Sequence, residues 1–243
     1  MGLTSTMNEP TTHLNVHDWQ PLTLRELREV LRGLEAPWWI AGGWAIDLFL
    51  GRQTRPHEDL DVLILRRDQL RVQQHLHGWR LYKTKQPTPS TLAPWPANEF
   101  LAWETGVYDI WAKQTETGGW RFQLMLMEDD TDRWVFRRDP RIGGRVADLG
   151  WMTDDGLPVL RPAVQLLYKG RLESRRPKDD ADFAAVLPHL AEDARRWLAD
   201  ELRLQFGARH PWIVELGVTA RTSARHVCCR KLGSHLLNGQ AGG

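Results

Sequence analysis

The chain has 243 residues, of which 42% are hydrophobic and 26% charged, as in an ordinary globular protein with one large or two small domains. Its net charge of +1 argues against a nucleic-acid partner, because nucleic-acid-binding domains are usually strongly basic. No apolar run reaches the roughly 20 residues of a membrane helix, and residues 1–16 lack the apolar core of a signal peptide. The only cysteines, Cys228 and Cys229, are adjacent and have no metal-type spacing, so we expect a cytoplasmic protein without a membrane partner.

Hydrophobic periodicity predicts an alternation of helices and strands in the first part of the chain. Residues 1–17 are expected to be a flexible segment, and Thr23 is a plausible N-cap for the first helix. The elements expected after it are strand 38–41, helix 44–50, strand 59–65, helix 67–77, strand 79–83, a hairpin of strands 100–113 and 120–127, and a short strand 134–138.

The second part of the chain has a helical pattern. Apolar residues recur at helical spacing in 162–172, 178–187 and 191–206, whereas the pattern weakens after Pro211. We therefore predict an α+β fold: a mixed sheet with helices over residues 18–155, a helical C-terminal domain over 156–210, and a poorly structured tail over 211–243.

The strongest chemical signal is a glycine pair followed by two aspartates. Gly42 and Gly43 lie where a strand turns into a helix, so backbone N–H groups there can approach a phosphate closely. Asp59 and Asp61 are two residues apart on the next strand, so both carboxylates point the same way. Such a pair on an apolar strand is costly unless a cation neutralises it. Mg²⁺ suits the pair, because it binds through a few carboxylates plus phosphate oxygens.

Three short motifs carry a family resemblance. They are Gly42-Gly43-Trp44-Ala45-Ile46-Asp47, Leu50-Gly51-Arg52 and Thr54-Arg55-x-His57-x-Asp59-x-Asp61. Together they resemble the aminoglycoside 2''-adenylyltransferase-like branch of the polymerase-β-type nucleotidyltransferase superfamily. The resemblance implies a nucleotidyltransferase domain with a mixed sheet, a helical domain after it, two Mg²⁺ ions, and an NTP, usually ATP, as co-substrate.

The resemblance also implies a third carboxylate on a later strand, as a metal ligand and general base. Asp109 is our choice, because it lies in the middle of an apolar run, where a charged side chain needs a partner. Glu128 is the alternative, at the point where a strand meets an acidic loop. We therefore expect Asp59, Asp61 and Asp109 to be both the metal ligands and the catalytic residues.

Basic residues near these motifs are candidates for phosphate binding. Arg52, Arg55 and His57 lie between the glycine pair and the aspartates, and an arginine fork matches phosphate oxygens. In the helical part, Lys178 begins a Lys-Asp-x-x-Asp-Phe motif like one that related enzymes carry near the nucleotide, and Lys169 is its alternative. We expect Gly42, Gly43, Arg55, His57 and Lys178 to bind the nucleotide, and Asp47 to be a structural ion-pair partner.

The expected reaction is transfer of AMP from ATP to a hydroxyl group of a small acceptor. An aminoglycoside-type antibiotic is the acceptor that the resemblance favours. The alternatives are a lincosamide, a protein or a tRNA acceptor, or a nucleotide-binding module without catalysis. Residues 128–132 contain four acidic side chains that could attract a polycationic acceptor, although a solvated acidic loop explains them better.

Overall fold

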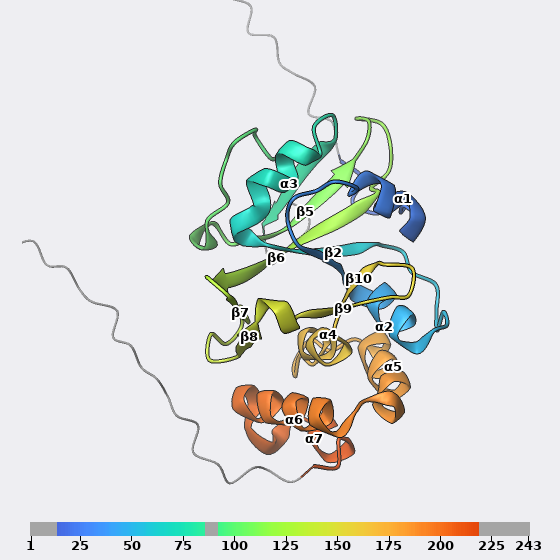
Figure 1. Cartoon of the computed structure of the whole chain (residues 1–243), viewed down its shortest axis with the longest axis vertical. Coiled ribbons are helices and arrows are strands. Elements are labelled where there is room, and N and C mark those ends of the chain that lie inside the picture. Colours follow the sequence, from blue (N-terminus) through green and yellow to red (C-terminus); the bar gives the residue numbers. More distant parts are fainter. Residues whose placement is uncertain (1–13, 86–91, 219–243) are drawn as a thin grey trace, which may run out of the picture.

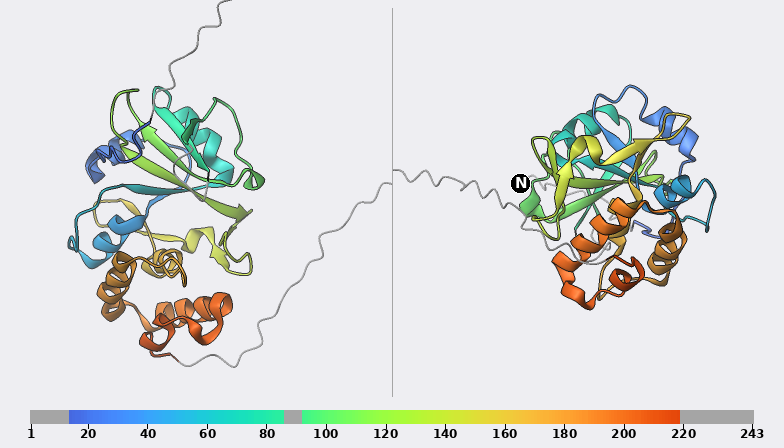
Figure 2. Two further views of the ribbon diagram at one scale, coloured as in Figure 1. Left: turned by 180° about the vertical axis from the view of Figure 1, so that it is seen from behind. Right: turned by 60° about the horizontal axis from the view of Figure 1, so that its bottom comes forward.

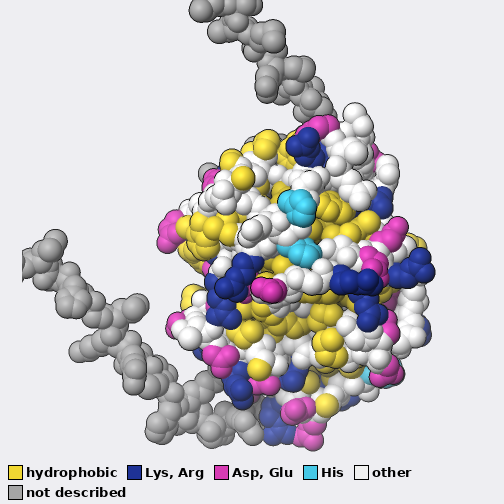
Figure 3. Space-filling view, turned by 45° about the horizontal axis from the view of Figure 1, so that its top comes forward, with side chains coloured by type: hydrophobic (Ala, Val, Ile, Leu, Met, Phe, Trp, Pro, Cys, Tyr) yellow, Lys and Arg dark blue, Asp and Glu magenta, His cyan; other side chains and the backbone are white. Residues whose placement is uncertain are grey.

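The computed structural model describes residues 14–85 and 92–218, and it has the expected α+β class (Figure 1). In this part of the chain no helix is long and apolar enough to cross a bilayer. Figure 3 shows basic and acidic side chains interspersed over the face that it presents, in keeping with the near-neutral composition.

The secondary structure begins as the sequence predicts. Thr23 caps the first helix: its hydroxyl accepts a hydrogen bond from the Glu26 N–H while the Glu26 carboxylate accepts one from the Thr23 N–H. The helices are α1 (Leu24–Val30), α2 (Gly42–Leu50), α3 (Gln69–His75), α4 (Pro162–Lys169), α5 (Pro177–Val186), α6 (Glu192–Phe206) and α7 (Trp212–Glu215). The strands are β1 (Trp38–Ile40), β2 (Asp61–Leu65), β3 (Arg80–Lys85), β4 (Leu92–Pro94), β5 (Val107–Lys113), β6 (Phe122–Asp130), β7 (Arg133–Val135), β8 (Gly143–Arg145), β9 (Gly150–Met152) and β10 (Pro158–Leu160).

These strands form one mixed sheet, as predicted, in the order β4-β3-β5-β6-β2-β1-β10-β9, with β7 and β8 attached to β6. The pairs β2–β6 and β1–β10 are parallel, and the remaining pairs are antiparallel. The expected hairpin is present as β5 and β6. Its first strand is shorter than predicted, because Trp103–Thr105 form a turn of 3₁₀ helix that ends at Gly106 with φ +70°.

The sheet is the middle layer of the molecule, with a hydrophobic core on each face. Along β2, Val62 and Ile64 pack into the core beside α1 and α3, whereas Leu63 and Leu65 pack into the core on the side of α4, α5 and α6. This alternation follows from the two-residue period of a strand. Because Asp61 is two residues before Leu63, it belongs to the face that looks toward the helical half.

The helices α4 to α7 lie together on that side of the sheet, which both views of Figure 2 show in the yellow-brown to red part of the chain. The first residues of the predicted tail contain α7, which follows Pro211; Trp212 is 1% exposed, and its ring is stacked on Phe183 with the centroids 4.3 Å apart. The rest of that predicted tail, 219–243, lies outside the described residues.

The predicted divisions at residues 17, 155 and 210 stay predictions. Residues 1–13 of the expected flexible segment are outside the described part, whereas Leu14 and Val16 pack against a small aromatic cluster. The strand β10 joins the sheet after residue 155, so the sheet draws on both sides of that expected boundary.

Candidate active site

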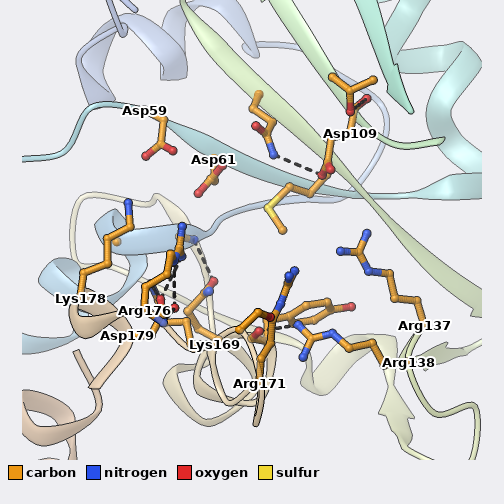
Figure 4. A pocket seen from close by; sticks show the side chains of 18 of the residues that line it. Asp59, Asp61, Asp109, Arg137, Arg138, Lys169, Arg171, Arg176, Lys178 and Asp179 are labelled. Carbon is orange, nitrogen blue, oxygen red and sulfur yellow. Dashed lines mark hydrogen bonds and ion pairs between the residues drawn. The ribbon is translucent and has the colours of Figure 1, made fainter. Parts of the chain in front are cut away.

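A cavity of about 390 Å³ lies between the sheet and the helical half of the molecule (Figure 4). It brings together most of the residues that the sequence singled out, although they are as many as 136 positions apart in the chain: Gly42, Gly43, Arg55, Asp59, Asp61, Asp109 and Lys178 all line it. We call the side formed by β2, β5 and β6 the sheet wall, and the side formed by α4, α5 and the loop between them the helical wall.

The sheet wall owes its arrangement to strand register. Asp61 on β2 lies beside Gln123 on β6, and Asp109 on β5 lies beside Met125 of the same central strand. Gln123 Nε2 donates a 3.2 Å hydrogen bond to Asp109 Oδ1, which orients that carboxylate. Asp59 precedes β2 instead of lying within it as predicted, but it lines the same cavity.

Asp61 is in a position that disfavours its charge. Burial, followed by the nearby charges of Asp59 and Asp109, raises the pKa of the Asp61 carboxyl to about 7, although Lys169 and Arg176 act in the opposite direction. Gly42 makes this position possible: a Cβ there would lie 2.0 Å from Asp61 Oδ2, and its φ of +66° also favours glycine. The absence of a Cβ at Gly42 therefore leaves the space that the Asp61 carboxylate occupies in the cavity wall.

Within residues 14–85 and 92–218, no three His, Cys, Asp or Glu side chains are grouped closely enough to hold a metal ion by themselves. The register gives a physical reason. Strand β6 separates β2 from β5, so the backbones of Asp61 and Asp109 are about 10 Å apart, or two strand spacings. Asp59 and Asp61 are instead a two-carboxylate site open to the cavity, which is the kind that Mg²⁺ completes with phosphate oxygens and water.

His57 does not line the cavity, although it was expected to bind the nucleotide. Its side chain is 1% exposed, and its Nε2 lies 2.5 Å from Asp47 Oδ2. Asp47 also accepts hydrogen bonds from the Thr54 N–H and hydroxyl, at 3.0 and 2.5 Å. The structural role predicted for Asp47 is thus visible: it ties the loop before Asp59 to α2.

Gly43 allows that loop to pack against α2. A Cβ on Gly43 would lie 2.3 Å from His57 Nδ1 and 2.6 Å from Arg55 Nη2. The N–H of Gly42 donates to Gln165 Oε1 on α4 at 2.8 Å, so it is not available to a phosphate. No side chain caps the start of α2, however, and the helix therefore still offers first-turn N–H groups beyond Gly42.

The helical wall is held by a buried network of ion pairs. Lys169 on α4, 6% exposed, lies 2.7 Å from Asp182 and 3.4 Å from Asp179, both on α5. Asp182 also binds Arg55 Nε at 3.2 Å, which joins α5 to the loop before the sheet wall. Arg176 pairs with Asp179 at 2.9 Å. Burial raises the pKa of Asp179, but the hydrogen bonds from Arg176 and the charge of Lys169 outweigh it and leave the pKa below its ordinary value.

Lys178 differs from these cations. It lines the cavity, and it has no ion-pair partner in the described part of the chain, whereas Lys169 is neutralised by two aspartates. Figure 4 shows Lys178 on the helical wall, facing the side of the cavity where Asp59 and Asp61 lie. Of the two lysines singled out from the sequence, Lys178 is thus the one placed to meet an anion.

Glu128 is accounted for by a different contact. Its Oε1 lies 2.5 Å from Arg66 Nε, and the neighbouring Asp129 pairs with Arg67 at 2.7 Å. Neither residue lines the cavity. The geometry thus favours Asp109 over Glu128 as the third carboxylate, and it gives the acidic residues at the end of β6 a structural explanation.

Several cavity residues were not among the catalytic or nucleotide-binding residues predicted from the sequence. Gln165 and Tyr168 come from α4, and the basic additions come from the turn after β7 and from the α4–α5 loop: Arg137, Arg138, Arg171 and Arg176. The paired arginines at 137–138 and 175–176 were the available sequence signal. Nothing in the local pattern places these segments opposite the aspartates, because the placement depends on how the helical half folds back.

Comparison with known proteins supports the predicted resemblance. Residues 23–94 match the family model described as aminoglycoside-2''-adenylyltransferase. A 2''-aminoglycoside nucleotidyltransferase of Klebsiella pneumoniae is 47% identical over 47 residues, which are 18% of this chain and 27% of the relative. One of Escherichia coli is 65% identical over 26 residues, 11% of this chain and 15% of the relative. The chain thus spans only about a quarter or less of the length of these relatives.

Two solved structures are similar in outline. The lincomycin-bound lincosamide antibiotic adenylyltransferase LnuA has a TM-score of 0.47 at 18% identity, covering 69% of this chain and 98% of that one. ANT(2")-Ia in complex with adenylyl-2"-tobramycin has a TM-score of 0.46 at 15% identity, covering 75% and 95%. These scores are too low for a functional conclusion, so the fold rests on the structure itself.

Proposed function

We propose that this chain, which resembles the aminoglycoside 2''-adenylyltransferases over residues 23–94, is a nucleotidyltransferase that moves AMP from ATP to a hydroxyl group of a small acceptor. The observation that carries the proposal is the pairing of the two walls. Asp59 and Asp61 face a helical wall rich in basic side chains, so metal-bound phosphates fit between them.

Asp59 and Asp61 are the proposed Mg²⁺ ligands, and Asp109, which β6 separates from them, is the proposed general base. The raised pKa of Asp61 fits this role, because its position favours an ionised carboxylate only when a cation is nearby. Bound Mg²⁺ would neutralise phosphate charge and make the α-phosphorus easier to attack. The proposed site holds two Mg²⁺ ions, the number that the family resemblance implies.

The proposed phosphate contacts come from both walls. Uncapped N–H groups at the start of α2 offer hydrogen bonds and the positive end of a helix dipole. Lys178, without an ion-pair partner among the described residues, offers a positive charge from the facing side. Arg55 is held by Asp182 and lines the cavity, so its guanidinium enters the site already oriented. His57 acts by holding the loop through Asp47.

The proposed chemistry is an in-line displacement at phosphorus. The acceptor hydroxyl gives its proton to Asp109, its oxygen forms a bond to the α-phosphorus, and the bond from the α-phosphorus to the bridging oxygen breaks. Pyrophosphate leaves with that bonding pair. Gln123 holds the Asp109 carboxylate in position for the proton. Positioning and charge neutralisation supply most of the acceleration in such reactions.

The acceptor is the part of the proposal that the family match supports least. The match ends at residue 94, before β5 and before the helical wall. The names of the relatives make aminoglycosides the first acceptors to test, with lincosamides second, in the cytoplasmic setting where ATP and Mg²⁺ are abundant.

Mass spectrometry tests the transfer directly. Purified protein is incubated with ATP, Mg²⁺ and a library of hydroxyl-bearing small molecules that includes aminoglycosides and lincosamides, and the products are searched for an AMP adduct. We expect an adduct and stoichiometric pyrophosphate from the native protein, and neither from Asp61→Asn. ATP binding that requires Mg²⁺, but without any adduct across the library, would support the non-catalytic module instead.

A further inference from the structure

A second hollow of about 580 Å³ adjoins the candidate active site. It shares Arg137, Arg138, Arg171 and Ser174 with the first cavity, so these residues form a wall common to both. Tyr108, next to Asp109 on β5, also lines it. Figure 4 shows Arg137 and Arg138 on the side of Asp109, away from Asp59 and Lys178. The second hollow therefore opens from the end of the site where the proposed general base lies.

The charge of this hollow is positive. Four arginines line it, at positions 137, 138, 171 and 209, against a single carboxylate, that of Glu173. In the described part of the chain none of the four makes an ion pair, in contrast to their neighbours Arg175 and Arg176 on the same loop. Clustered guanidiniums without carboxylate partners repel one another, and a bound anion would relieve that repulsion.

Arg138 carries the clearest sign of a missing partner. Its Nη1 is buried without a hydrogen bond, while its Nη2 donates to the backbone oxygen of Tyr168. Burial, followed by the charges of Arg171 and Arg137, lowers the pKa of Arg138 to about 10. A buried donor without an acceptor is costly, and an anionic ligand oxygen is the acceptor that suits it best.

The hollow also has aromatic walls. The Arg137 guanidinium lies 4.6 Å from the centre of the Tyr108 ring, and Phe206 of α6 lines the hollow together with Arg209. The Tyr108 contact holds Arg137 in place without neutralising it. A small molecule with a carbon skeleton and an anionic group matches this lining, whereas a polycation meets like charge on most sides.

We propose that this second hollow, which we call the arginine subsite, binds the acceptor, and that the acceptor is a small hydroxyl-bearing molecule carrying a phosphate or carboxylate group. This inference rests on the proposed function, because a molecule accepts AMP here only if the protein is a nucleotidyltransferase. The anionic group lies among Arg137, Arg138 and Arg171, and the acceptor hydroxyl reaches Asp109. The transfer step is the displacement described above, with the anionic group unchanged.

The lining of the arginine subsite does not suit a polycationic acceptor. An aminoglycoside would need carboxylates around its ammonium groups. The acidic stretch at 128–132 does not supply them, because Glu128 and Asp129 are paired with Arg66 and Arg67 and lie outside both hollows. The arginine subsite selects for the opposite charge.

Calorimetric titration with the nucleotide site filled tests the proposal. The protein is first titrated with α,β-methylene-ATP and Mg²⁺, whose bridging carbon prevents transfer, and the complex is then titrated with inorganic phosphate, acetate or tobramycin. We expect saturable binding of phosphate or acetate, and the tighter of the two identifies the anionic group. Tobramycin is expected to bind at least tenfold more weakly than that anion.

Two charge-matched variants complete the test. Arg171→Gln removes one subsite guanidinium, and Arg25→Gln removes an exposed arginine on α1 that makes no ion pair with any described residue. We expect anion affinity to fall at least tenfold in the first and less than twofold in the second, with affinity for the nucleotide analogue falling less than anion affinity in the first, because Arg171 also lines the nucleotide cavity, and unchanged in the second. If neither anion binds the native complex, if tobramycin binds as tightly as the anions, or if Arg171→Gln weakens only the nucleotide analogue, the proposal is wrong.

The first titration keeps this outcome separate from the proposed function. Failure of the analogue to bind with Mg²⁺ counts against nucleotidyl transfer, whereas analogue binding without anion binding counts against the arginine subsite alone.

Discussion

On the helical wall of the cavity, Asp179 and Asp182 are held by Lys169, Arg176 and Arg55 at 2.7 to 3.4 Å. On the sheet wall, Asp59 and Asp61 make no ion pair with any described residue, and the pKa of Asp61 is raised. Both pairs of aspartates belong to the walls of the same cavity, on opposite sides. The difference is that the helical pair is already neutralised by the protein, whereas the sheet pair needs a cation from outside.

This contrast separates structural carboxylates from functional ones. A buried ion pair that is complete contributes to the position of its elements, and removing one partner leaves the other charge buried and costly. A carboxylate that the fold keeps without a cation is costly in the folded state and becomes favourable on binding a metal.

Asp61→Asn should have the largest effect on activity. Loss of one metal-binding carboxylate is expected to lower the transfer rate by about 10³-fold or more, because charge neutralisation at phosphorus depends on it. Thermal unfolding in Mg²⁺-free buffer should show a midpoint no lower than that of the native protein, because a carboxylate with an unfavourable charge has been removed. A variant that keeps more than a tenth of the rate would contradict the metal assignment.

Asp182→Asn should mainly affect stability. It leaves Lys169, 6% exposed, with one fewer partner, and we expect the free energy of unfolding to fall by about 3 kcal/mol. Urea denaturation measures this. The matched control is Asp200→Asn, which breaks an i,i+3 pair with Arg203 on α6 and should cost less than about 1 kcal/mol. Equal losses of unfolding free energy in the two variants would mean that the buried ion pairs of the helical wall stabilise the fold no more than the more exposed pair on α6 does.

Gly42→Ala should disturb the sheet wall without a change in charge. The added Cβ would lie 2.0 Å from Asp61 Oδ2, so that carboxylate must move, and we expect an activity loss of about 100-fold. Gly51→Ala is the control: it has a similar φ of +65° but no heavy atom within 4 Å of the added Cβ. That control should lose about 1 kcal/mol of stability and keep its activity. Similar activities in the two variants would contradict the claim that Gly42 makes room for the metal-binding carboxylate of Asp61.

The pH dependence of Mg²⁺ binding should follow Asp61. Since its pKa is raised to about 7, protons compete with the metal below that pH, and Mg²⁺ affinity should rise by up to about tenfold per pH unit until pH 7 and then level off. The metal-free fold has the opposite trend: the contribution of Asp61 to stability is full below about pH 4 and is lost as pH rises through 7. Titration calorimetry and thermal unfolding across this range measure both, and Asp61→Asn should flatten both curves.

The sequence predicted the sheet wall better than the helical wall, for a physical reason. Gly42, Asp59, Asp61 and Asp109 lie on or beside strands, where the two-residue period fixes the face on which a side chain appears. The side chain of His57 points inward because it pairs with Asp47 and packs against Gly43. Its place in a polar loop of the sequence suggests a contact with the nucleotide instead. The cavity arginines come from loops whose placement depends on packing between distant helices, which local periodicity does not specify.

The central claim is that the sheet wall binds a nucleotide through a metal. Titration of α,β-methylene-ATP into the native protein and into Asp61→Asn, each in Mg²⁺ and in EDTA, tests it most directly. We predict tight binding only for the native protein in Mg²⁺, and a loss of at least tenfold in affinity in the other three titrations. Equal affinity in EDTA and in Mg²⁺, unchanged by Asp61→Asn, would contradict the account.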